Sequence, residues 1–260
     1  MTEETRTHQI ELWLDDRHLE YHRRQFSQPY RSTVHLMEFV RNVMGARANA
    51  PMKALDVPCG GGANIFHLSQ VLPHTDWTGL DINSKALAIA IEMNAGKDRG
   101  NDSYSFLCGD FNNLAKYFPP HSLDLVFSIQ TLSWLPEYKS MVAQFLSLLK
   151  PGGIVFVTSL FNDFLVDARI EVTQYSPDNL ANGWGPFFYN VYSLDRFRQS
   201  CMELGASEVR AKDFEMDVDL PMPTDRQMGT FTRVLRDGSR LQFSGPLLMP
   251  WKFLAVLMPV

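Results

Sequence analysis

Cysteine is scarce in this sequence. The 260 residues include three cysteines, Cys59, Cys108 and Cys201, which lie far apart and form no C-x-x-C pair. A disulfide framework needs several pairs of cysteines, and a structural zinc site needs clustered ligands. We therefore interpret all three as reduced residues in or near the core of a cytoplasmic protein, and we expect no metal site.

A membrane-spanning run and an excess of basic residues are also missing. The first residues, MTEETRTHQI, contain no apolar signal core, and the apolar run from Phe253 to Val260 is far shorter than the roughly 20 residues that span a bilayer. The net charge is −5 and the pI is about 5.8, whereas nucleic-acid-binding proteins usually carry a basic surface. We expect neither a membrane nor a nucleic acid as partner, and monomer and homodimer both stay open.

The most informative stretch that is present is ALDVPCGGGAN, residues 54–64. It reads as a buried strand with Asp56 near its end, followed by a glycine turn, Gly60–Gly62, that opens a helix. A second acid, Asp81, ends the next apolar run. Strand, glycine turn, helix, strand and acid form the layout of a nucleoside pocket in a doubly wound sheet, where the acid accepts hydrogen bonds from the ribose hydroxyls.

Two features of this stretch favour S-adenosylmethionine over a dinucleotide as the ligand. The dinucleotide fingerprint is G-x-G-x-x-G, and here Ile65 stands at the position of its third glycine. The carboxylate of Asp56 would repel a pyrophosphate, but it suits a ligand that carries an ammonium and a sulfonium.

Apolar runs of strand length alternate with amphipathic segments along the rest of the chain, which predicts an α/β protein with a parallel sheet. The dipeptide Asp237-Gly238 between two apolar segments predicts a hairpin. The predicted helices are 10–25, 32–44, 62–72, 84–95, 138–149 and 193–204. The predicted strands are 53–58, 76–81, 104–108, 123–129, 153–159, 206–216, 230–235, 240–243 and 252–258.

Between Lys53 and Thr158 the chain resembles the class I S-adenosylmethionine-dependent methyltransferases of the small-molecule type. ALDVPCGGGAN resembles the first motif of that family, with Pro58 at the position of its first glycine, and TGLDIN resembles the second. FLCGDFNNL, LDLVFSIQTLSWL and LLKPGGIVFVTS resemble the later motifs, in order and at the usual spacing. The resemblance implies that Asp81 binds the ribose, that Asp110 lies near the adenine amino group, and that Phe111 lies near the adenine ring.

The resemblance also implies the fold, a doubly wound, mostly parallel seven-stranded sheet of the Rossmann-like methyltransferase type that ends in an antiparallel strand. We predict a single domain over residues 1–260. We divide it into an N-terminal helical cap (1–48), a cofactor-binding core (49–160), a substrate lid segment (161–192) and a C-terminal part of the sheet with a hairpin insertion (193–260).

The motifs and the resemblance together predict the site residues. Arg31 is a candidate to bind the methionyl carboxylate, and a solvated arginine at a helix start is the alternative. The predicted cofactor-binding residues are Tyr30, Arg31, Asp56, Pro58, Cys59, Gly60, Gly62, Asp81, Ile82, Asp110, Phe111, Ile129 and Gln130. The predicted substrate-binding residues are Tyr21, Phe26, Trp134, Phe161, Trp184, Phe188 and Tyr189. No catalytic residue is identified, and the candidates are Gln130, Trp134, His18, His22 and Tyr189.

The function that we predict is the transfer of a methyl group from S-adenosylmethionine to an N or O atom of a small molecule by in-line displacement, with S-adenosylhomocysteine as the product. The sulfonium is an activated donor, so alignment of the acceptor and exclusion of water suffice, and a general base is optional. Three alternatives stay open: a non-catalytic S-adenosylmethionine-binding module, a methyltransferase that acts on protein or RNA, and a nicotinamide-dependent oxidoreductase.

Overall fold

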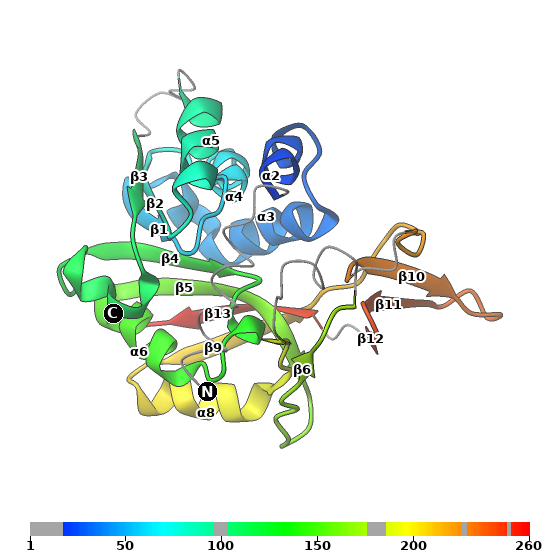
Figure 1. Cartoon of the computed structure of the whole chain (residues 1–260). Coiled ribbons are helices and arrows are strands. Elements are labelled where there is room, and N and C mark those ends of the chain that lie inside the picture. Colours follow the sequence, from blue (N-terminus) through cyan, green and yellow to red (C-terminus); the bar gives the residue numbers. More distant parts are fainter. Residues whose placement is uncertain (1–17, 96–102, 176–185, 225–227, 249–250) are drawn as a thin grey trace.

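Most of the strands form one mostly parallel sheet with helices on both of its faces, and two smaller sheets lie outside it (Figure 1). The computed structural model describes residues 18–95, 103–175, 186–224, 228–248 and 251–260. The helices are α2 (His18–Ser27), α3 (Arg31–Met44), α4 (Ala63–Leu68), α5 (Ser84–Asn94), α6 (Lys139–Leu148) and α8 (Leu194–Glu203), with short 3-10 turns η1 (Gly45–Asn49), η2 (Phe111–Lys116) and η3 (Leu132–Trp134). The strands are β1 (Met52–Asp56), β2 (Thr75–Asp81), β3 (Ser103–Cys108), β4 (Leu123–Ile129), β5 (Leu149–Asn162), β6 (Glu171–Val172), β7 (Phe187–Phe188), β8 (Tyr192–Ser193), β9 (Glu208–Asp213), β10 (Thr230–Val234), β11 (Arg240–Ser244), β12 (Leu247–Leu248) and β13 (Trp251–Leu257).

The order of strands in the main sheet is β3-β2-β1-β4-β5-β13-β9, and β8 pairs with the end of β5. The pairs from β3 to β5 are parallel, whereas β13 is antiparallel to both β5 and β9. This confirms the predicted mostly parallel sheet of seven core strands, including the antiparallel last strand.

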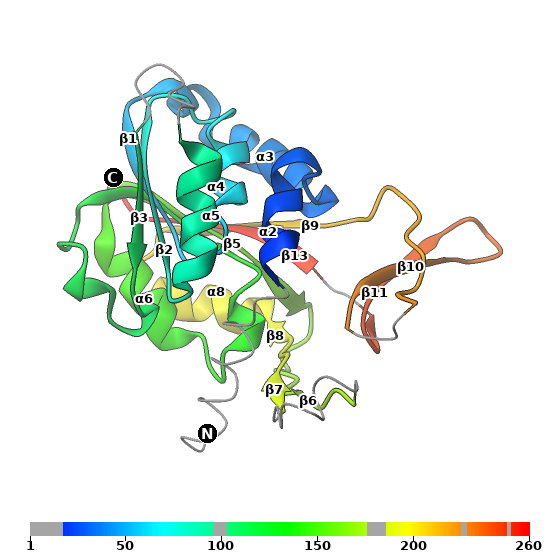
Figure 2. The same ribbon diagram turned by 45° about the horizontal axis from the view of Figure 1, so that its top comes forward.

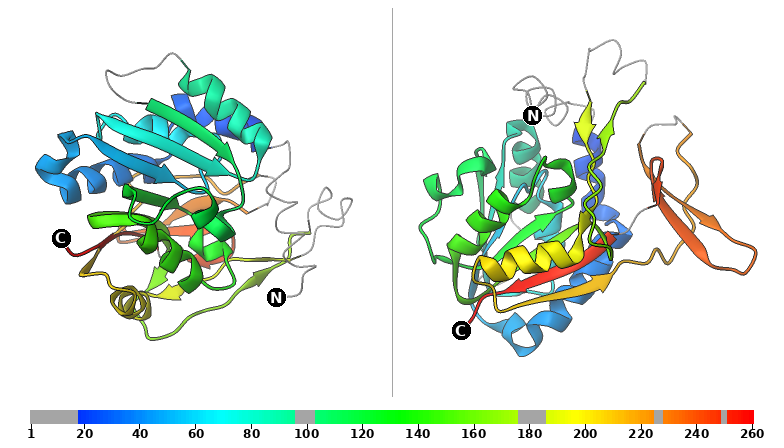
Figure 3. Two further views of the ribbon diagram at one scale, coloured as in Figure 1. Left: turned by 90° about the vertical axis from the view of Figure 1, so that its left-hand side faces the viewer. Right: turned by 90° about the horizontal axis from the view of Figure 1, so that it is seen from below.

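Side chains alternate between two apolar clusters on the two faces of the sheet, as expected for strands that are covered on both sides. Ala54, Phe127 and Phe156 face a cluster that includes α3 and α4, while residues one position along face a cluster that includes α6 and α8. Views from the side and from below show these two helical layers with the sheet between them (Figure 3). No helix in the described part of the chain is long and apolar enough to cross a membrane.

The predicted hairpin is confirmed as β10 and β11, which form a small sheet with β12. It projects away from the main sheet (Figure 2), and it precedes β13 in the chain as predicted. Other boundaries differ. Helix α4 ends at Leu68, because turns follow where the prediction extended the helix to residue 72. Residues 10–17 of the predicted first helix lie outside the described residues.

The cysteines are free thiols, and they differ in burial. Cys59 and Cys201 are buried, as predicted, whereas Cys108 is exposed. Cys108 ends β3, an edge strand of the sheet that pairs on one side with β2. An edge strand leaves part of its surface to solvent, so an apolar run alone does not establish burial there.

Candidate active site

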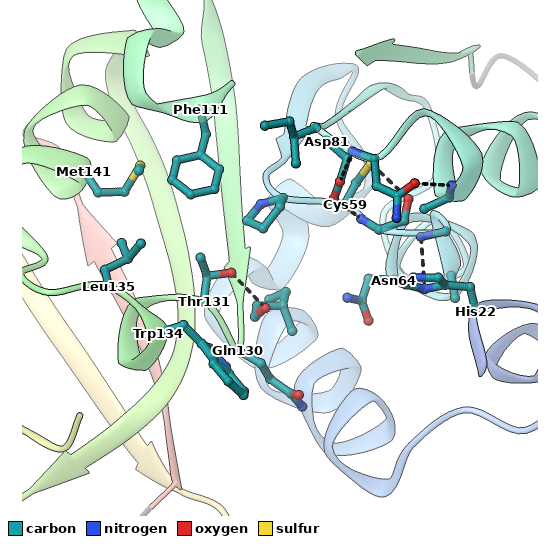
Figure 4. A pocket seen from close by; sticks show the side chains of 18 of the residues that line it. His22, Cys59, Asn64, Asp81, Phe111, Gln130, Thr131, Trp134, Leu135 and Met141 are labelled. Atoms are coloured by element: carbon teal, nitrogen blue, oxygen red, sulfur yellow. Dashed lines mark hydrogen bonds between the residues drawn. The ribbon is translucent and has the colours of Figure 1, made fainter. Parts of the chain in front are cut away.

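A pocket of about 570 Å³ lies where the carboxyl ends of the parallel strands meet the N-terminal helices. That is the edge at which open α/β sheets bind their ligands, and the volume is typical of small-molecule sites. Residues at and after the ends of β1, β2, β3 and β4 form one wall of the pocket, and His22 of α2 lies at another (Figure 4). Tyr21 and Gln25 of α2, Tyr30 directly before α3, and Thr33 of α3 also line it. Met228 lines the pocket from the segment before β10.

The glycine turn after β1 lies directly against His22 of α2. The Gly61 N–H donates a hydrogen bond to His22 Nδ1 at 3.3 Å, drawn as a dashed line in Figure 4. A Cβ atom at Gly61 would lie 2.6 Å from the His22 Cβ, and one at Gly60 would lie 2.9 Å from the His22 ring. The backbone of Gly60 and Gly61 therefore lines the pocket without room for side chains.

Gly62 does not line the pocket, in contrast to the prediction. It adopts a left-handed conformation with φ of +78°, and a Cβ there would lie within about 3 Å of Ala90, Asn94 and Phe106. Gly62 therefore faces α5 and β3 rather than the pocket. Its role is to pack the turn onto its neighbours.

Asp81 lines the pocket and is held by backbone N–H groups on both carboxylate oxygens. Gly60 N–H donates to Oδ2 at 2.7 Å, and Asn83 N–H donates to Oδ1 at 2.8 Å. Burial raises the pKa of Asp81, and these N–H groups partly offset that rise because they stabilise the carboxylate. The carboxylate is thus fixed in orientation between the glycine turn and the start of α5.

Asp56 is completely buried and does not line the pocket, so the structure does not place this acid where the sequence predicted it. Neither carboxylate oxygen has a hydrogen-bond partner among the described residues. Burial first, and the neighbouring charge of Asp81 second, raise the pKa of Asp56 well above its usual value. Asp56 is the last residue of β1, and the pocket lining in this part of the chain begins only at Pro58.

The segment after β3 brings Asp110 and Phe111 to the pocket, next to Ile82 from the loop after β2. Asp110 Oδ1 accepts hydrogen bonds from the N–H of Asn112 at 2.9 Å and from its side-chain amide at 2.6 Å. The Phe111 ring points into the cavity (Figure 4). A carboxylate beside two apolar side chains is a suitable setting for a flat ring with an amino group.

Gln130, directly after β4, holds an unusual backbone conformation in the pocket wall. Its φ is +58°, which is uncommon for a residue other than glycine. The Gln130 N–H donates to the carbonyl oxygen of Thr158 at 2.8 Å, and its side-chain amide donates to Ser32 Oγ of α3 at 3.3 Å. Because such conformations persist only where the surroundings enforce them, often at functional sites, this one marks Gln130 for a role in the site.

Aromatic rings surround the part of the pocket next to Gln130. Trp134 stacks on Phe187 with ring centroids 5.0 Å apart, and it lies at the same distance from the tilted ring of Tyr189. Across the pocket, the rings of Tyr21 and Tyr30 are 5.6 Å apart. Burial raises the pKa of both tyrosine hydroxyls, which therefore stay protonated at neutral pH.

A buried polar network behind Trp134 was not found from the sequence. Asn190 donates its N–H to the carbonyl of Ser133 and its side-chain amide to the carbonyl of Leu135, both at 2.7 Å. The Tyr192 hydroxyl donates to the same Leu135 carbonyl at 2.7 Å, and the hydroxyls of Ser133 and Ser159 are 2.6 Å apart. These bonds join segments far apart in the chain, so no local pattern predicts them.

Several predicted substrate contacts are directed elsewhere. Phe161 is buried against Phe197, and Phe26 packs on Phe66, because each follows the apolar face of its own element. Tyr189 lies behind Trp134 with its hydroxyl 2.7 Å from Ser244 Oγ, and Phe188 belongs to β7; neither lines the pocket. Trp184 and the side chain of His18 lie outside the described residues.

Arg31 also does not line the pocket. Its Nε donates to Asp217 Oδ1 at 2.9 Å, and a second guanidinium nitrogen bonds the other oxygen of the same carboxylate. This ion pair lowers the pKa of Asp217 to about 2. Arg31 begins α3 on the side that faces the segment after β9, so its guanidinium is turned from the site.

The other predicted residues of the site do line the pocket. The structure brings together the predicted residues Tyr21, His22, Tyr30, Pro58, Cys59, Gly60, Asp81, Ile82, Asp110, Phe111, Ile129, Gln130 and Trp134. It adds lining residues that were not predicted: Gln25, Thr33, Gly61, Ala63, Asn64, Asn83, Ala86, Asn112, Thr131, Leu135, Pro136, Glu137, Ser140, Met141 and Met228. Several of the additions, such as Gly61, Asn83 and Thr131, are direct chain neighbours of predicted residues, so the motifs indicated the loops on which these residues lie.

The fold and the pocket together define a Rossmann-like α/β protein with a site for a nucleoside-containing cofactor. The chain belongs to the methyltransferase domain family, whose model matches residues 48–184. It is a class I methyltransferase by fold, and the cofactor of this family is S-adenosylmethionine.

Two similar curated proteins are methyltransferases that act on different acceptors. Phosphoethanolamine N-methyltransferase 1 of Arabidopsis thaliana is 24% identical over 73% of this chain and 36% of its own length. Sterol 24-C-methyltransferase ERG6B of Gibberella zeae is 29% identical over 64% of this chain and 40% of its own length. The chain thus spans well under half the length of these relatives.

Solved structures share the fold at low sequence identity. The [4+2]-cyclase SpnF is 20% identical with a TM-score of 0.59, covering 87% of this chain and 81% of its own. Phosphoethanolamine N-methyltransferase 2 of Haemonchus contortus, in complex with phosphomonomethylethanolamine and S-adenosylhomocysteine, is 15% identical with a TM-score of 0.54, covering 87% of this chain and 53% of its own.

Proposed function

We propose that this protein transfers a methyl group from S-adenosylmethionine to a nitrogen or oxygen atom of a small molecule. The observation that carries the proposal is the pocket itself. It joins the glycine turn and the fixed carboxylate of Asp81 to an aromatic compartment beside Gln130 and Trp134. One continuous cavity therefore offers a nucleoside site and space for a second, small molecule.

The residues present fit the family cofactor. The Asp81 carboxylate is an acceptor for ribose hydroxyls, and Asp110, Ile82 and Phe111 provide an acceptor and apolar walls for adenine. The glycine turn carries no side chains, which leaves space for the methionyl part of the cofactor. The Gly61 N–H donates its hydrogen bond to His22. When bound, S-adenosylmethionine supplies a methyl group on a positively charged sulfur, which activates it for transfer.

The side chains of the site align the acceptor and keep out water. Gln130 is fixed by its backbone and by its bond to Ser32, and Trp134 is fixed by its stacked neighbours, so both present rigid surfaces to an acceptor. The protonated hydroxyls of Tyr21 and Tyr30 serve as hydrogen-bond donors rather than as bases. Alignment of this kind supplies much of the rate enhancement when the donor is already activated.

A specific observation keeps a second function in view. The chain shares its fold with a protein that is named as a [4+2]-cyclase, so the fold alone does not set the reaction. A pocket of about 570 Å³, with Tyr21, Tyr30 and Trp134 in its lining, agrees better with a small molecule than with a protein or RNA strand.

The test is a transfer assay with isotopically labelled S-adenosylmethionine and a library of small amines, phenols and alcohols. We expect label in a small product and an equal amount of S-adenosylhomocysteine, and we expect both to be lost in Asp81→Ala. Label in protein or RNA would contradict a small-molecule acceptor. A library product that forms without label would support the cyclase-like alternative, and cofactor binding without turnover across the library would support a binding module.

A further inference from the structure

The charges of the pocket give information about the acceptor. Among the described residues that line it, the acids are Asp81, Asp110 and Glu137, while lysine and arginine are not part of the lining and His22 is the one basic side chain. Glu137 is held at the start of α6, where its carboxylate accepts hydrogen bonds from the N–H of Lys139 at 2.7 Å and from the hydroxyl of Ser140. Three carboxylates in one partly enclosed cavity create a negative potential.

The remaining walls of the acceptor compartment combine aromatic and apolar side chains with uncharged polar ones such as Gln130 and Thr131. Trp134 is stacked on Phe187, Tyr21 lies against Tyr30, and Leu135 and Met228 complete the lining nearby. Ring faces of this kind attract apolar bodies and cations, and they repel anions because their electron density faces the ligand.

We propose that the acceptor has an apolar or aromatic body and carries no anionic group, a proposal that rests on the methyl-transfer function above. The carboxylates repel a phosphate or carboxylate substituent, and no lysine or arginine among the described lining residues offsets that repulsion. This separates the chain from its phosphoethanolamine-methylating relatives, whose acceptor carries a phosphate, and it points to neutral compounds and apolar amines.

His22 does not change this inference. Its Nδ1 already accepts the hydrogen bond from the Gly61 N–H, so that nitrogen carries no proton in this arrangement, and the ring lies on the glycine turn, away from Gln130 and Trp134 (Figure 4). A charge on His22 would act on the cofactor end of the pocket. The acceptor end keeps its aromatic character.

The test uses a matched pair of fluorescent probes. N-phenyl-1-naphthylamine is neutral, and 8-anilinonaphthalene-1-sulfonate has the same ring system with a sulfonate added. The protein is first saturated with S-adenosylhomocysteine, which a calorimetric titration verifies, and each probe is then titrated. Signal from the compartment is defined as the part that is lost in Trp134→Ala.

We expect the neutral probe to bind at least about tenfold more tightly than the sulfonate in that compartment. Glu137→Gln should bring the two affinities closer together, while Glu203→Gln, an exposed acid on α8, should leave their ratio unchanged. Equal or tighter binding of the sulfonate would overturn the inference, and so would failure of both probes to bind the saturated protein. Failure of S-adenosylhomocysteine to bind would instead contradict the proposed function, which keeps the two failures apart.

Discussion

The pocket has two halves that are built in different ways. In the cofactor half, which comprises residues 58–61, 81–83 and 110–112, backbone groups and short side chains directly follow adjacent strands of the sheet. In the acceptor half, which comprises Tyr21, Tyr30, Gln130, Trp134 and Met228, side chains come from separate parts of the chain and depend on stacking and buried hydrogen bonds.

The difference separates residues that the edge of the sheet positions from residues that packing between distant segments positions. Parallel strands bring their carboxyl ends to one edge, so a short motif after each strand is enough to build the cofactor half. The acceptor half has no such scaffold, because its side chains come from segments that are far apart in the chain. We expect damage to the first half to abolish cofactor binding and damage to the second to spare it.

The largest effect is expected for Asp81→Ala in the cofactor half. The change removes the acceptor for the ribose hydroxyls and also the bonds to the N–H groups of Gly60 and Asn83. Loss of a charged acceptor of two hydrogen bonds should weaken S-adenosylhomocysteine binding by about 2–4 kcal/mol, measured by calorimetry. Asp76→Ala, an exposed acid on the same strand, is the control, and equal affinity in both variants would refute the assignment of Asp81.

The glycine turn offers a contrast between two adjacent positions. Gly62→Ala should lower the free energy of unfolding by about 1–3 kcal/mol, since the added methyl group meets Ala90 and Phe106 and the left-handed backbone disfavours it. Gly61→Ala should lower stability as well, because its methyl group would lie 2.6 Å from the His22 Cβ, and it should in addition weaken cofactor binding, because Gly61 and His22 both line the pocket. Thermal unfolding and calorimetry on both variants measure the two effects. Loss of cofactor binding in Gly62→Ala with normal binding in Gly61→Ala would contradict the division of roles.

Asn190→Leu tests whether the buried hydrogen bonds of Asn190 stabilise the acceptor half. The change removes the side-chain amide bonded to the Leu135 carbonyl and should loosen the loop that carries Trp134. We expect faster hydrogen exchange in residues 131–136 and an affinity for S-adenosylhomocysteine within about twofold of wild type. Tyr192→Phe, which removes one hydroxyl from the same carbonyl, should give a weaker form of the same result. Unchanged exchange in both variants would show that the loop is held by other contacts.

Asp56→Asn tests the buried acid behind the cofactor half through its pH dependence. The raised pKa of Asp56 means that the unfolded chain releases this proton at about pH 4 while the folded chain keeps it to higher pH. The stability of the wild type should therefore fall as pH rises through this window, relative to the variant. Urea unfolding should show similar stabilities near pH 4 and an advantage for Asn that grows as the pH rises toward 7. A constant difference at all pH values would mean that the folded-state pKa is not raised.

The smallest effect is expected for Arg31→Ala. Its guanidinium binds the exposed Asp217 outside the pocket, and exposed ion pairs contribute little. Affinity for S-adenosylhomocysteine should stay within about twofold of the wild type by calorimetry. A large loss would restore the sequence-based assignment of Arg31 to the methionyl carboxylate.

The sequence predicted the two halves unequally, for a physical reason. Asp81 and the glycine turn were predicted from the local pattern of apolar strands and turns, and Asp110 from the resemblance of FLCGDFNNL to a family motif; Asp81, Gly60 and Asp110 all line the pocket. Gly62 and Asp56 lie in the same motif but face away from the pocket, and direction is set by backbone dihedrals that the motif does not reveal. Phe161 and Tyr189 were assigned to the substrate because they lie in or beside a long connection rich in aromatic residues. Such residues occur both in loops that bind a ligand and in loops that pack against the rest of the fold, and the sequence alone does not distinguish the two.

The most direct test is a crystal structure of the protein with S-adenosylhomocysteine. We expect the ribose hydroxyls on the Asp81 carboxylate, the adenine beside Ile82 and Phe111, and the sulfur atom facing Gln130 and Trp134. A ligand bound in the opposite direction, or one that makes no contact with Asp81, would contradict the division of the pocket into a cofactor half and an acceptor half.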